Sequence, residues 1–162
     1  MIEIHPSAKI SDLCDIEDST RGTRIIIGEN CVVDSFVKIK PAGGNGDVVI
    51  GSSSYINSGC VLYSGSGITI GNNVLIAANC TLAPVNHDFR DPDRLIREQG
   101  FLPSKGGIRV ENDVWIGANS VILDGAYLRE GCIIGAGSIV RGEVPSYAIM
   151  GGNPLKILGS RK

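Results

Sequence analysis

The chain has 162 residues, the size of a single domain, and its 15 Lys and Arg nearly balance its 17 Asp and Glu. This balance argues against a nucleic-acid-binding protein, because such proteins carry a basic excess. Glycine is abundant, at 22 residues, while aromatic residues make up 5% of a chain that is 43% hydrophobic. Since glycine costs about 1 kcal/mol in a helix interior, the composition argues against a helical bundle and predicts a core of Ile, Val and Leu.

The N-terminal residues lack a basic region followed by an apolar run, so we expect no secretory leader. No stretch approaches the roughly 20 apolar residues that span a bilayer, so we expect no membrane insertion. The five cysteines are an odd number and include no CxxC pair. This pattern argues against a disulfide framework and predicts a reducing, cytoplasmic location.

A six-residue repeat runs along the chain from about residue 4 to residue 144. Its first position holds only Ile, Val or Leu: Ile4, Ile10, Ile16, Ile27, Val33, Ile39, Ile50, Ile56, Leu62, Ile70, Ile76, Leu82, Val110, Ile116, Ile122, Leu128, Ile134 and Val140. The register shifts only between groups of three repeats. A strand and a two-residue turn fit each repeat, and three repeats make one triangular coil. The sequence therefore predicts an all-β fold of about six stacked coils with a short C-terminal tail, residues 145–162.

Two other positions of the repeat indicate corners. The fifth position holds small or β-branched residues throughout, except at Asn86, and it contains all five cysteines: Cys14, Cys31, Cys60, Cys80 and Cys132. We therefore interpret the cysteines as corner fillers rather than as nucleophiles or ligands. Glycine recurs at the second position, where a close backbone approach would leave no room for a Cβ: Gly28, Gly51, Gly71, Gly117 and Gly135.

The repeat is interrupted at residues 22–26, 44–49 and 68–69, and by a long segment from Asp88 to Arg109. Loops longer than about 12–15 residues in a compact domain are usually functional or disordered. The functional interpretation is favoured here because Asn86 and His87 stand where the coil ends and this loop begins. The chain's other histidine, His5, precedes a proline in the first coil, and we interpret it as surface structure.

The strings IGSSSYI, IGNNVLIAANCTL, VWIGANSVI and IIGAGSIV resemble the hexapeptide-repeat family, whose fold is a left-handed parallel β-helix. The handedness is implied by this resemblance alone. IGNNVLIAANCTL, the histidine-bearing loop, VENDVWIGANSVILDG, IIGAGSIV and GGNPLKIL follow the order found in sugar O-acetyltransferases, including the maltose, galactoside, capsule and O-antigen enzymes. The resemblance implies acetyl-CoA as co-substrate, a sugar or nucleotide-sugar acceptor and no metal.

The resemblance also implies a catalytic role for His87 as general base. A neutral imidazole, whose ordinary pKa is about 6.5, suits proton removal from an acceptor hydroxyl near neutral pH. The hydroxyl would attack the thioester carbonyl directly, and backbone N–H groups or a water would stabilise the oxyanion. The partner of the imidazole stays open among a backbone carbonyl and four carboxylates: Asp88, Asp91, Asp93 and Glu98.

Further site residues follow from matching family positions. Tyr55-Ile56-Asn57 matches a family Tyr-x-Asn, so Asn57 is expected to contact the acceptor, as is Asn86. Ser64-Gly65 stands where the family often has an acidic pair. The residues expected to contact acetyl-CoA are Trp115, Ala118, Ala136, Arg141 and Lys156. Gly142 replaces a frequent lysine near the phosphates, and the family's usual assembly implies a homotrimer with sites between subunits.

The sequence leaves several alternatives open. The repeat begins at Ile4, without the helical segment that precedes the coils of the maltose and galactoside enzymes, and this favours relatives that act on polysaccharide or lipopolysaccharide sugars. An amino-sugar N-acetyltransferase, a xenobiotic acetyltransferase and a non-catalytic scaffold are the other candidates. A γ-carbonic anhydrase needs three histidine ligands, and the chain has only His5 and His87.

Overall fold

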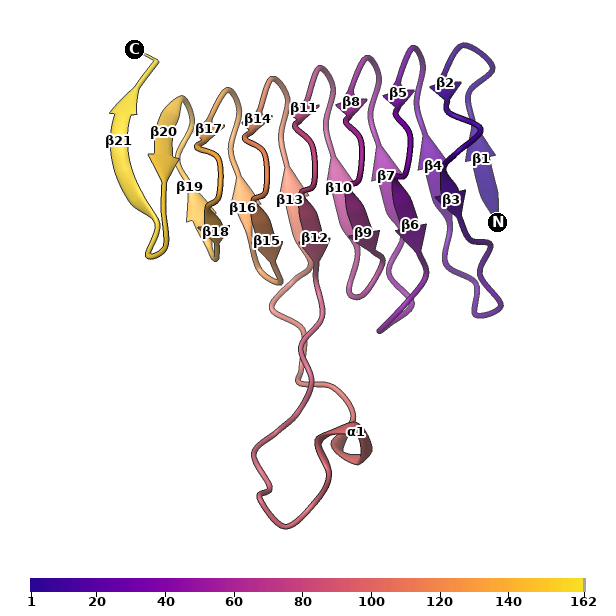
Figure 1. The fold of residues 1–162 in the computed structure, drawn as a ribbon, viewed down its shortest axis with the longest axis vertical. Helices are drawn as coiled ribbons and strands as arrows, with labels where there is room; N and C mark the ends of the chain where they lie inside the picture. The colour runs from indigo at the N-terminus through magenta and orange to yellow at the C-terminus, as the bar shows by residue number, and fades with distance from the viewer. Residues whose placement is uncertain (162) are drawn as a thin grey trace.

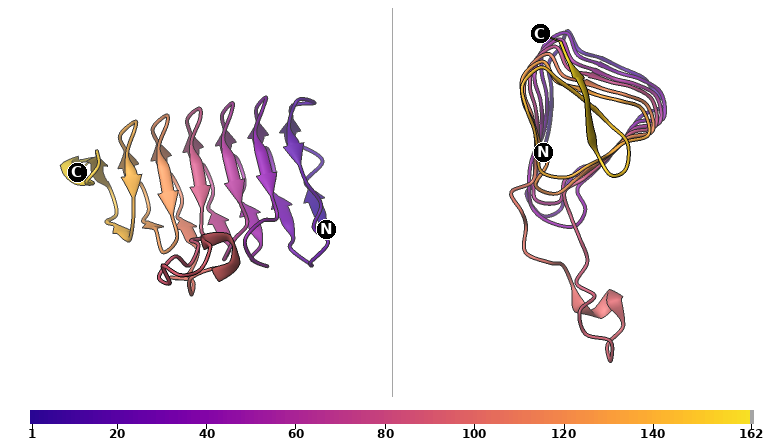
Figure 2. Two further views of the ribbon diagram at one scale, coloured as in Figure 1. Left: turned by 60° about the horizontal axis from the view of Figure 1, so that its bottom comes forward. Right: turned by 90° about the vertical axis from the view of Figure 1, so that its left-hand side faces the viewer.

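The structure, a computed structural model, describes residues 1–161 as a triangular prism of stacked coils (Figures 1 and 2). Each of the six complete coils contributes one strand to each of three sheets, whose strands run parallel except for β21. The first sheet contains β1 (Ile2–Ile4), β4 (Ile25–Ile27), β7 (Val48–Ile50), β10 (Ile68–Ile70), β13 (Ile108–Val110), β16 (Tyr127–Leu128) and β19 (Glu143–Val144). The second contains β2 (Lys9–Ile10), β5 (Val32–Val33), β8 (Tyr55–Ile56), β11 (Leu75–Ile76), β14 (Trp115–Ile116), β17 (Ile133–Ile134), β20 (Ala148–Gly151) and β21 (Lys156–Ser160). The third contains β3 (Asp15–Ile16), β6 (Lys38–Lys40), β9 (Val61–Tyr63), β12 (Thr81–Ala83), β15 (Val121–Leu123) and β18 (Ile139–Val140).

The aliphatic first positions of the repeat form one continuous core, as predicted. From Ile27 to Val140 each of these side chains is exposed by 3% or less. The first coil differs, because Ile4 is 41% exposed and Ile10 and Ile16 are only partly buried. Within residues 1–161 a coil stacks on only one side of these three side chains, so their other side stays open.

The glycines at the second position of the repeat allow neighbouring coils to approach closely. A Cβ built on Gly117 would lie 2.5 Å from the backbone nitrogen of Ala136, and one on Gly71 would lie 2.6 Å from Asn112 Oδ1. Similar contacts confirm the prediction at Gly28 and Gly51, at 3.0 and 2.5 Å. Gly135 differs, because the nearest atoms would lie at 3.6 Å, an ordinary van der Waals contact.

The cysteines fill corners of the core and form no disulfide within the described chain. Cys31, Cys60, Cys80 and Cys132 are fully buried, and the Cys60 and Cys80 thiols donate to the carbonyls of Ala77 and Gly117 at 3.1 and 3.2 Å. Burial raises the pKa of Cys132 to about 12. The Cys132 thiol therefore stays protonated, and the four buried cysteines fill the corners as small side chains, as the repeat predicts.

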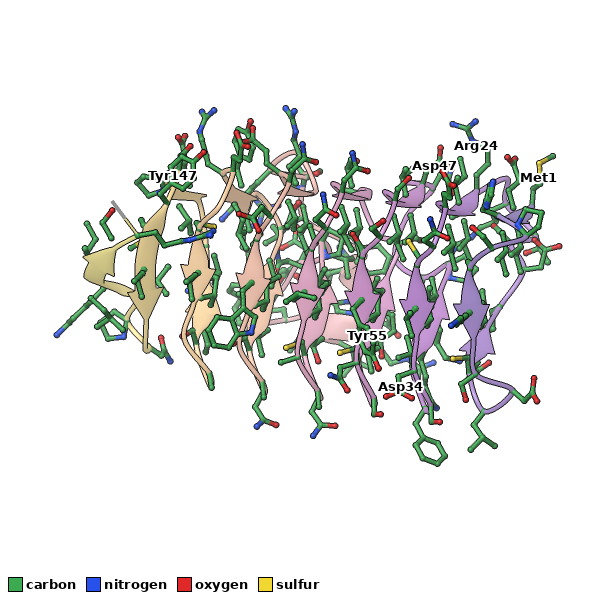
Figure 3. The ribbon with its side chains drawn as sticks, turned by 90° about the horizontal axis from the view of Figure 1, so that it is seen from above. Met1, Arg24, Asp34, Asp47, Tyr55 and Tyr147 are labelled. Carbon is green, nitrogen blue, oxygen red and sulfur yellow. The ribbon has the colours of Figure 1, made fainter. Side chains whose placement is uncertain are left out.

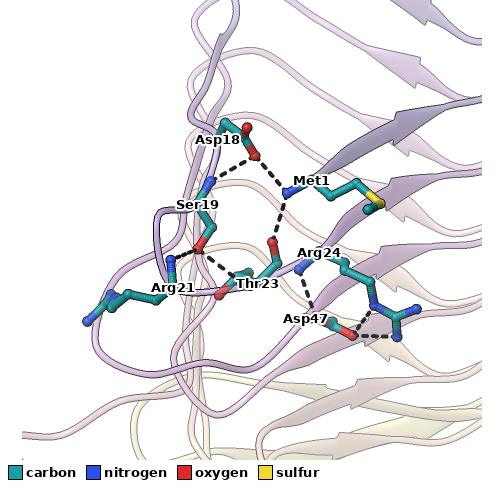
Figure 4. A network of polar contacts seen from close by, with 7 residues as sticks. All are labelled: Met1, Asp18, Ser19, Arg21, Thr23, Arg24 and Asp47. Carbon is teal, nitrogen blue, oxygen red and sulfur yellow. Dashed lines mark hydrogen bonds and ion pairs between the residues drawn. The ribbon is translucent and has the colours of Figure 1, made fainter.

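Hydrogen bonds between polar side chains and the backbone close the short break near residues 22–26 (Figure 4). The N-terminal amine of Met1 donates to Asp18 Oδ1 at 2.7 Å and to the Thr23 carbonyl at 3.3 Å. Asp47 accepts from the Arg24 backbone N–H at 2.8 Å and from its guanidinium at 2.7 Å. The break thus changes the length of the coil without interrupting the sheets on either side of it.

The C-terminal tail folds back over the end of the prism. β20 continues the second sheet in parallel with β17, and β21 then pairs with β20 in the antiparallel sense. Seen along the prism axis, β21 crosses the triangle at its C-terminal end (Figure 2). Met150 and Leu155 pack against the core there, so the tail closes this end of the prism.

The long loop leaves the prism after β12 and returns to it at β13, projecting away from one edge (Figure 1). It carries the short helix α1 (Ile96–Gln99). The sheets continue past it without a shift, because Ile68 pairs with Ile108 and Leu82 pairs with Ile122. Within residues 1–161 no helix is long and apolar enough to cross a membrane.

Candidate functional site

His87 lies on the outgoing arm of the long loop, close to the prism. Its backbone pairs with that of Phe101 on the returning arm as an isolated antiparallel bridge. On either side of this pair, Asp88 N donates to the Gly100 carbonyl at 3.0 Å and Leu102 N donates to the Asn86 carbonyl at 2.8 Å. The two arms therefore form a short antiparallel stem, which fixes the backbone of His87 relative to the coils.

The imidazole of His87 is exposed and borders an apolar pocket. The pocket has a volume of about 250 Å³ and is lined by Ala42, Gly43, Tyr63, Val85, His87 and Phe101. The imidazole and phenyl ring centroids lie 4.7 Å apart, with an angle of 37° between the ring planes. Gly43 has a φ of +78°, and a Cβ at this position would lie 2.6 Å from Val85 Cγ2. The absence of that Cβ lets Val85 pack closely against the turn that forms one wall of the pocket.

None of the four carboxylates considered as partners bonds to the imidazole. Asp88 instead accepts from its neighbour Arg90, whose Nε lies 2.9 Å from Asp88 Oδ1. The Arg90 guanidinium lowers the pKa of Asp88 to about 2. Over residues 1–161 the ring nitrogens of His87 make no hydrogen bond, so both nitrogens are accessible to a ligand or a second chain.

Asn57 and Trp115 share a second pocket, on the face of the second sheet. Tyr55, Leu75 and Trp115 stand in register on β8, β11 and β14. With Asn57, Ile76 and Ala77 they line a pocket of about 270 Å³. Leu75 and Trp115 are 53% and 49% exposed, so this face presents unusually large apolar side chains. Figure 3 shows Tyr55 on this face, with Asp34 near the adjoining edge.

The pockets of His87 and Asn57 have no lining residue in common. Within one chain the structure therefore does not bring together the proposed base and the proposed acceptor contact. The structure places Asn57 and Trp115 in one pocket, although we expected Asn57 to contact the acceptor and Trp115 to contact acetyl-CoA.

A pocket of about 660 Å³ lies at the root of the long loop. Its lining residues are Asn86, Phe89, Leu102, Pro103, Lys105, Leu123, Asp124, Gly125, Arg141 and Gly142. It thus joins two residues expected from the sequence, Asn86 and Arg141. In residues 1–161 the side chains of Lys105 and Arg141 form no ion pair, so the pocket carries two cations that are free to bind an anion.

Asp124 anchors the returning arm beside this pocket. The side chain is 6% exposed and accepts hydrogen bonds from Lys105 N at 2.7 Å, Gly107 N at 2.9 Å and Ser104 Oγ at 3.3 Å. Lys105, Asp124 and Phe101 were not predicted from the sequence. The Asp-Gly pair at residues 124–125 signals a turn, but no pattern in the sequence relates it to the loop.

The remaining predicted residues lie on other parts of the prism. Ala118 and Ala136 occupy consecutive coils at one corner, where Gly137 N donates to the Ala118 carbonyl at 2.8 Å. Lys156 is exposed on β21, and it lines neither the loop-root pocket nor the Trp115 pocket. The structure therefore places Arg141, but not Lys156, beside the loop root.

Two family models match the chain. "Bacterial transferase hexapeptide (six repeats)" matches residues 107–142, and "Hexapeptide repeat of succinyl-transferase" matches residues 46–84. Among curated relatives, the chain is 34% identical to a galactoside O-acetyltransferase of Escherichia coli K12 over 82% of its length. It is 28% identical, over 72%, to a putative lipopolysaccharide biosynthesis O-acetyl transferase, WbbJ, of the same strain. The chain spans 62% of the length of each of these relatives.

Solved structures match nearly the whole chain. A variant of AntD, an N-acyltransferase from Bacillus cereus solved with dTDP-4-amino-4,6-dideoxyglucose and coenzyme A, superposes with a TM-score of 0.83 and 27% identity. The match covers 99% of this chain and 84% of that one. A hexapeptide-repeat acetyltransferase of Vibrio cholerae gives a TM-score of 0.68 and 26% identity, covering 96% and 72% of the two chains. These matches confirm the predicted fold, a left-handed parallel β-helix.

Proposed function

This chain belongs to the hexapeptide-repeat transferase family, and on that premise we propose that it transfers an acetyl group from acetyl-CoA to a sugar hydroxyl. The observation that carries the proposal is the exposed imidazole of His87, held at a loop root beside a pocket with both ring nitrogens free within the described residues. We further propose that the acceptor is a polysaccharide, lipopolysaccharide or nucleotide-linked sugar, and that the protein acts in the cytoplasm.

In the proposed mechanism His87 accepts the proton of the acceptor hydroxyl as its oxygen attacks the thioester carbonyl. The C–O bond forms as the carbonyl π electrons move to its oxygen, where backbone N–H groups or a water would stabilise the charge. Collapse of this intermediate breaks the C–S bond, and the imidazolium returns its proton to the sulfur. No acyl-enzyme is required, and the four fully buried cysteines are not available to form one.

For acetyl-CoA we propose two binding regions. Lys105 and Arg141 at the loop-root pocket would bind phosphate groups, because both cations are unpaired in residues 1–161 and phosphate oxygens accept charge-assisted hydrogen bonds. Backbone groups near Ala118 and Ala136, with Trp115, would hold the pantetheine arm. Lys105 would supply the charge that the family often places at the position of Gly142.

We also propose that the active form is a homotrimer with sites between subunits. His87 and Asn57 line separate pockets of one chain, so a site that uses both would need a second copy. The large apolar side chains on the second sheet, Leu75 and Trp115, are candidates for that contact.

An amino-sugar N-acyltransferase is the second candidate, favoured by the match to AntD over 99% of this chain. An amine acceptor would need the same base, so the two activities differ only in the acceptor.

The test is thiol release from acetyl-CoA with a panel of nucleotide-linked sugars, amino sugars and free glycosides. We expect His87→Ala to lose most of the activity while keeping the fold and assembly, because the residue is exposed on the loop. His5→Ala, which removes the other histidine, is the matched control and should remain active. Full activity of His87→Ala would refute the catalytic assignment, and release with amino sugars alone would select the second candidate.

Acetyl-CoA should also raise the melting temperature of the protein, since a ligand that binds only the folded state stabilises it. Absence of any shift at millimolar acetyl-CoA would favour a non-catalytic scaffold.

A further inference from the structure

We propose that Phe101 is the positioning residue of His87, holding the imidazole in its working orientation through ring contact. The inference rests on the proposed role of His87 as the base. It begins with the location of Phe101, on the opposite arm of the stem and directly across the backbone from His87. The ring centroids are 4.7 Å apart, within the range in which aromatic rings attract one another.

Ring contact is the main restraint on this imidazole in the described chain. A catalytic histidine is often oriented by a hydrogen bond from its second nitrogen to a carboxylate or a carbonyl. Within residues 1–161 His87 has no such bond, and Asp88, the carboxylate that follows it in the sequence, is bound to Arg90. The other pocket-lining side chains, Ala42, Tyr63 and Val85, are uncharged.

The stem couples this contact to the folding of the loop. Phe101 can face His87 only when the bonds Asp88 N to Gly100 O and Leu102 N to Asn86 O hold the two arms together. Phe101 is itself 50% exposed, so its ring adds little to the buried core of the prism. Its substitution is therefore expected to change the imidazole orientation far more than the stability of the coils.

Catalysis depends on this orientation because general-base transfer needs the nitrogen within hydrogen-bond reach of the hydroxyl. A freely rotating imidazole would spend less time in the productive orientation. The smaller fraction of correctly oriented imidazole would lower kcat. Binding of acetyl-CoA should be unaffected, because Phe101 lines neither the loop-root pocket nor the Trp115 pocket.

The first test is nuclear magnetic resonance of the two histidines and needs no substrate. The aromatic ¹H–¹³C spectrum should contain one set of imidazole signals from His5 and one from His87, assigned by their loss in His5→Gln and His87→Gln. We expect a ring-current shift on the His87 signals that disappears in Phe101→Leu, while the His5 signals stay unchanged. Identical His87 signals in the parent protein and in Phe101→Leu would overturn the proposed contact.

The second test is kinetic and uses the same variants. Phe101→Leu should lower kcat by about tenfold with the KM for acetyl-CoA unchanged, and Phe101→Tyr should restore most of kcat because it keeps the ring. Leu95→Ala, which removes another large exposed side chain of the same loop, is the control and should leave kcat unchanged.

Unchanged kcat in Phe101→Leu, with the ring-current shift lost, would overturn the positioning role. Failure of the proposed function has a different signature. In that case the parent protein would release no thiol from acetyl-CoA, or His87→Gln would be as active as the parent, while the ring-current experiment would still report whether Phe101 contacts His87.

Discussion

At Gly117 the structure leaves no space for even one methyl group. A Cβ would lie 2.5 Å from Ala136 N and 2.8 Å from the Ile134 carbonyl, and both contacts are with backbone atoms of the next coil. We expect Gly117→Ala to destabilise the protein by about 1–3 kcal/mol, the usual cost of forcing extra volume into a packed interior. Chemical denaturation monitored by circular dichroism would measure the loss.

Gly135 provides a matched control for this substitution. It holds the same position of the repeat one coil further on, where a Cβ would have its nearest neighbours at 3.6 Å. Gly135→Ala should therefore cost much less than Gly117→Ala. Equal destabilisation by the two substitutions would contradict the steric explanation.

The side chain of Glu111 contributes to the stability of the folded protein, and this contribution depends on pH. Its carboxylate accepts from the Tyr127 hydroxyl and, at 2.8 Å, from Glu130 N, and these bonds lower the pKa of Glu111. A carboxylate with a lowered pKa in the folded state stabilises that state above its ordinary pKa, and the contribution disappears as the pH falls through the folded-state pKa. We expect Glu111→Gln to be less stable than the parent protein at pH 7.

This stability difference should shrink as the pH falls below about 4.3, the ordinary pKa of glutamate. Urea denaturation at several pH values would measure it. Glu29→Gln changes an exposed side chain that makes no hydrogen bond in residues 1–161, so as a control it should leave the stability at pH 7 unchanged. A difference in the free energy of unfolding between Glu111→Gln and the parent protein that stays constant from pH 7 to pH 3 would contradict the expectation.

At the scale of elements, Asp124 connects the prism to the long loop. It accepts from the backbone N–H groups of Lys105 and Gly107, and Gly107 is buried. Asp124→Ala would leave these donors unpaired, at a cost of about 1–3 kcal/mol. We expect faster amide hydrogen exchange at residues 104–107, with exchange of the distant strands β5 and β8 unchanged.

Ser104→Ala serves as the comparison, because it keeps the Asp124 carboxylate and its bonds to Lys105 N and Gly107 N. It removes the bond from Ser104 Oγ to Asp124, at 3.3 Å, and the bond that Ser104 Oγ accepts from Gly106 N, at 2.9 Å. It should therefore have a smaller effect than Asp124→Ala on exchange at Lys105 and Gly107. An unchanged exchange rate at residues 105–107 in Asp124→Ala would show that the loop root is held by other contacts.

The elements also show why the sequence predicted some features and missed others. Ile56, Ile76 and Ile116 recur at fixed spacing within their coils, so the hexapeptide pattern was sufficient to place them in the core. His87 was found because it stands where that pattern stops. Phe101 contacts His87 through an antiparallel stem, and this pairing leaves no periodic signal in the sequence.

Asp124 and Lys105 were missed for a similar reason. They meet because the loop returns to the coil beside the next turn, and the return path depends on hydrogen bonds that a single sequence does not display. The absence of Lys156 from the loop-root pocket follows from β21, whose antiparallel return over the end of the prism was not predicted.

At the scale of the molecule, the prism is a stack in which each coil contacts only its neighbours, so stability should vary along the axis. The first coil is covered on one side in the described chain, and Ile4 is 41% exposed. The other end is closed by Met150 and Leu155 of the folded-back tail. We expect amide hydrogens of β1, β2 and β3 to exchange faster than those of β8, β11 and β14.

Hydrogen exchange followed by mass spectrometry would resolve this gradient. Removing the cap side chain in Leu155→Ala should extend rapid exchange to β17 and β20 while leaving β8 unchanged. Uniform exchange along the stack, or an equal effect of Leu155→Ala on all coils, would instead indicate that the whole prism unfolds as one cooperative unit.

The pairing of Ile68 with Ile108 and of Leu82 with Ile122 shows that the coils on either side of the long loop meet as direct neighbours. The loop between these coils therefore does not affect the pairing of the strands on either side of it, whatever its length. Mutation could lengthen, shorten or replace the outer part of this segment, around α1, without shifting a single strand. The architecture thereby separates what natural selection can vary freely, the length and sequence of the loop, from what it must keep, the register of the coils.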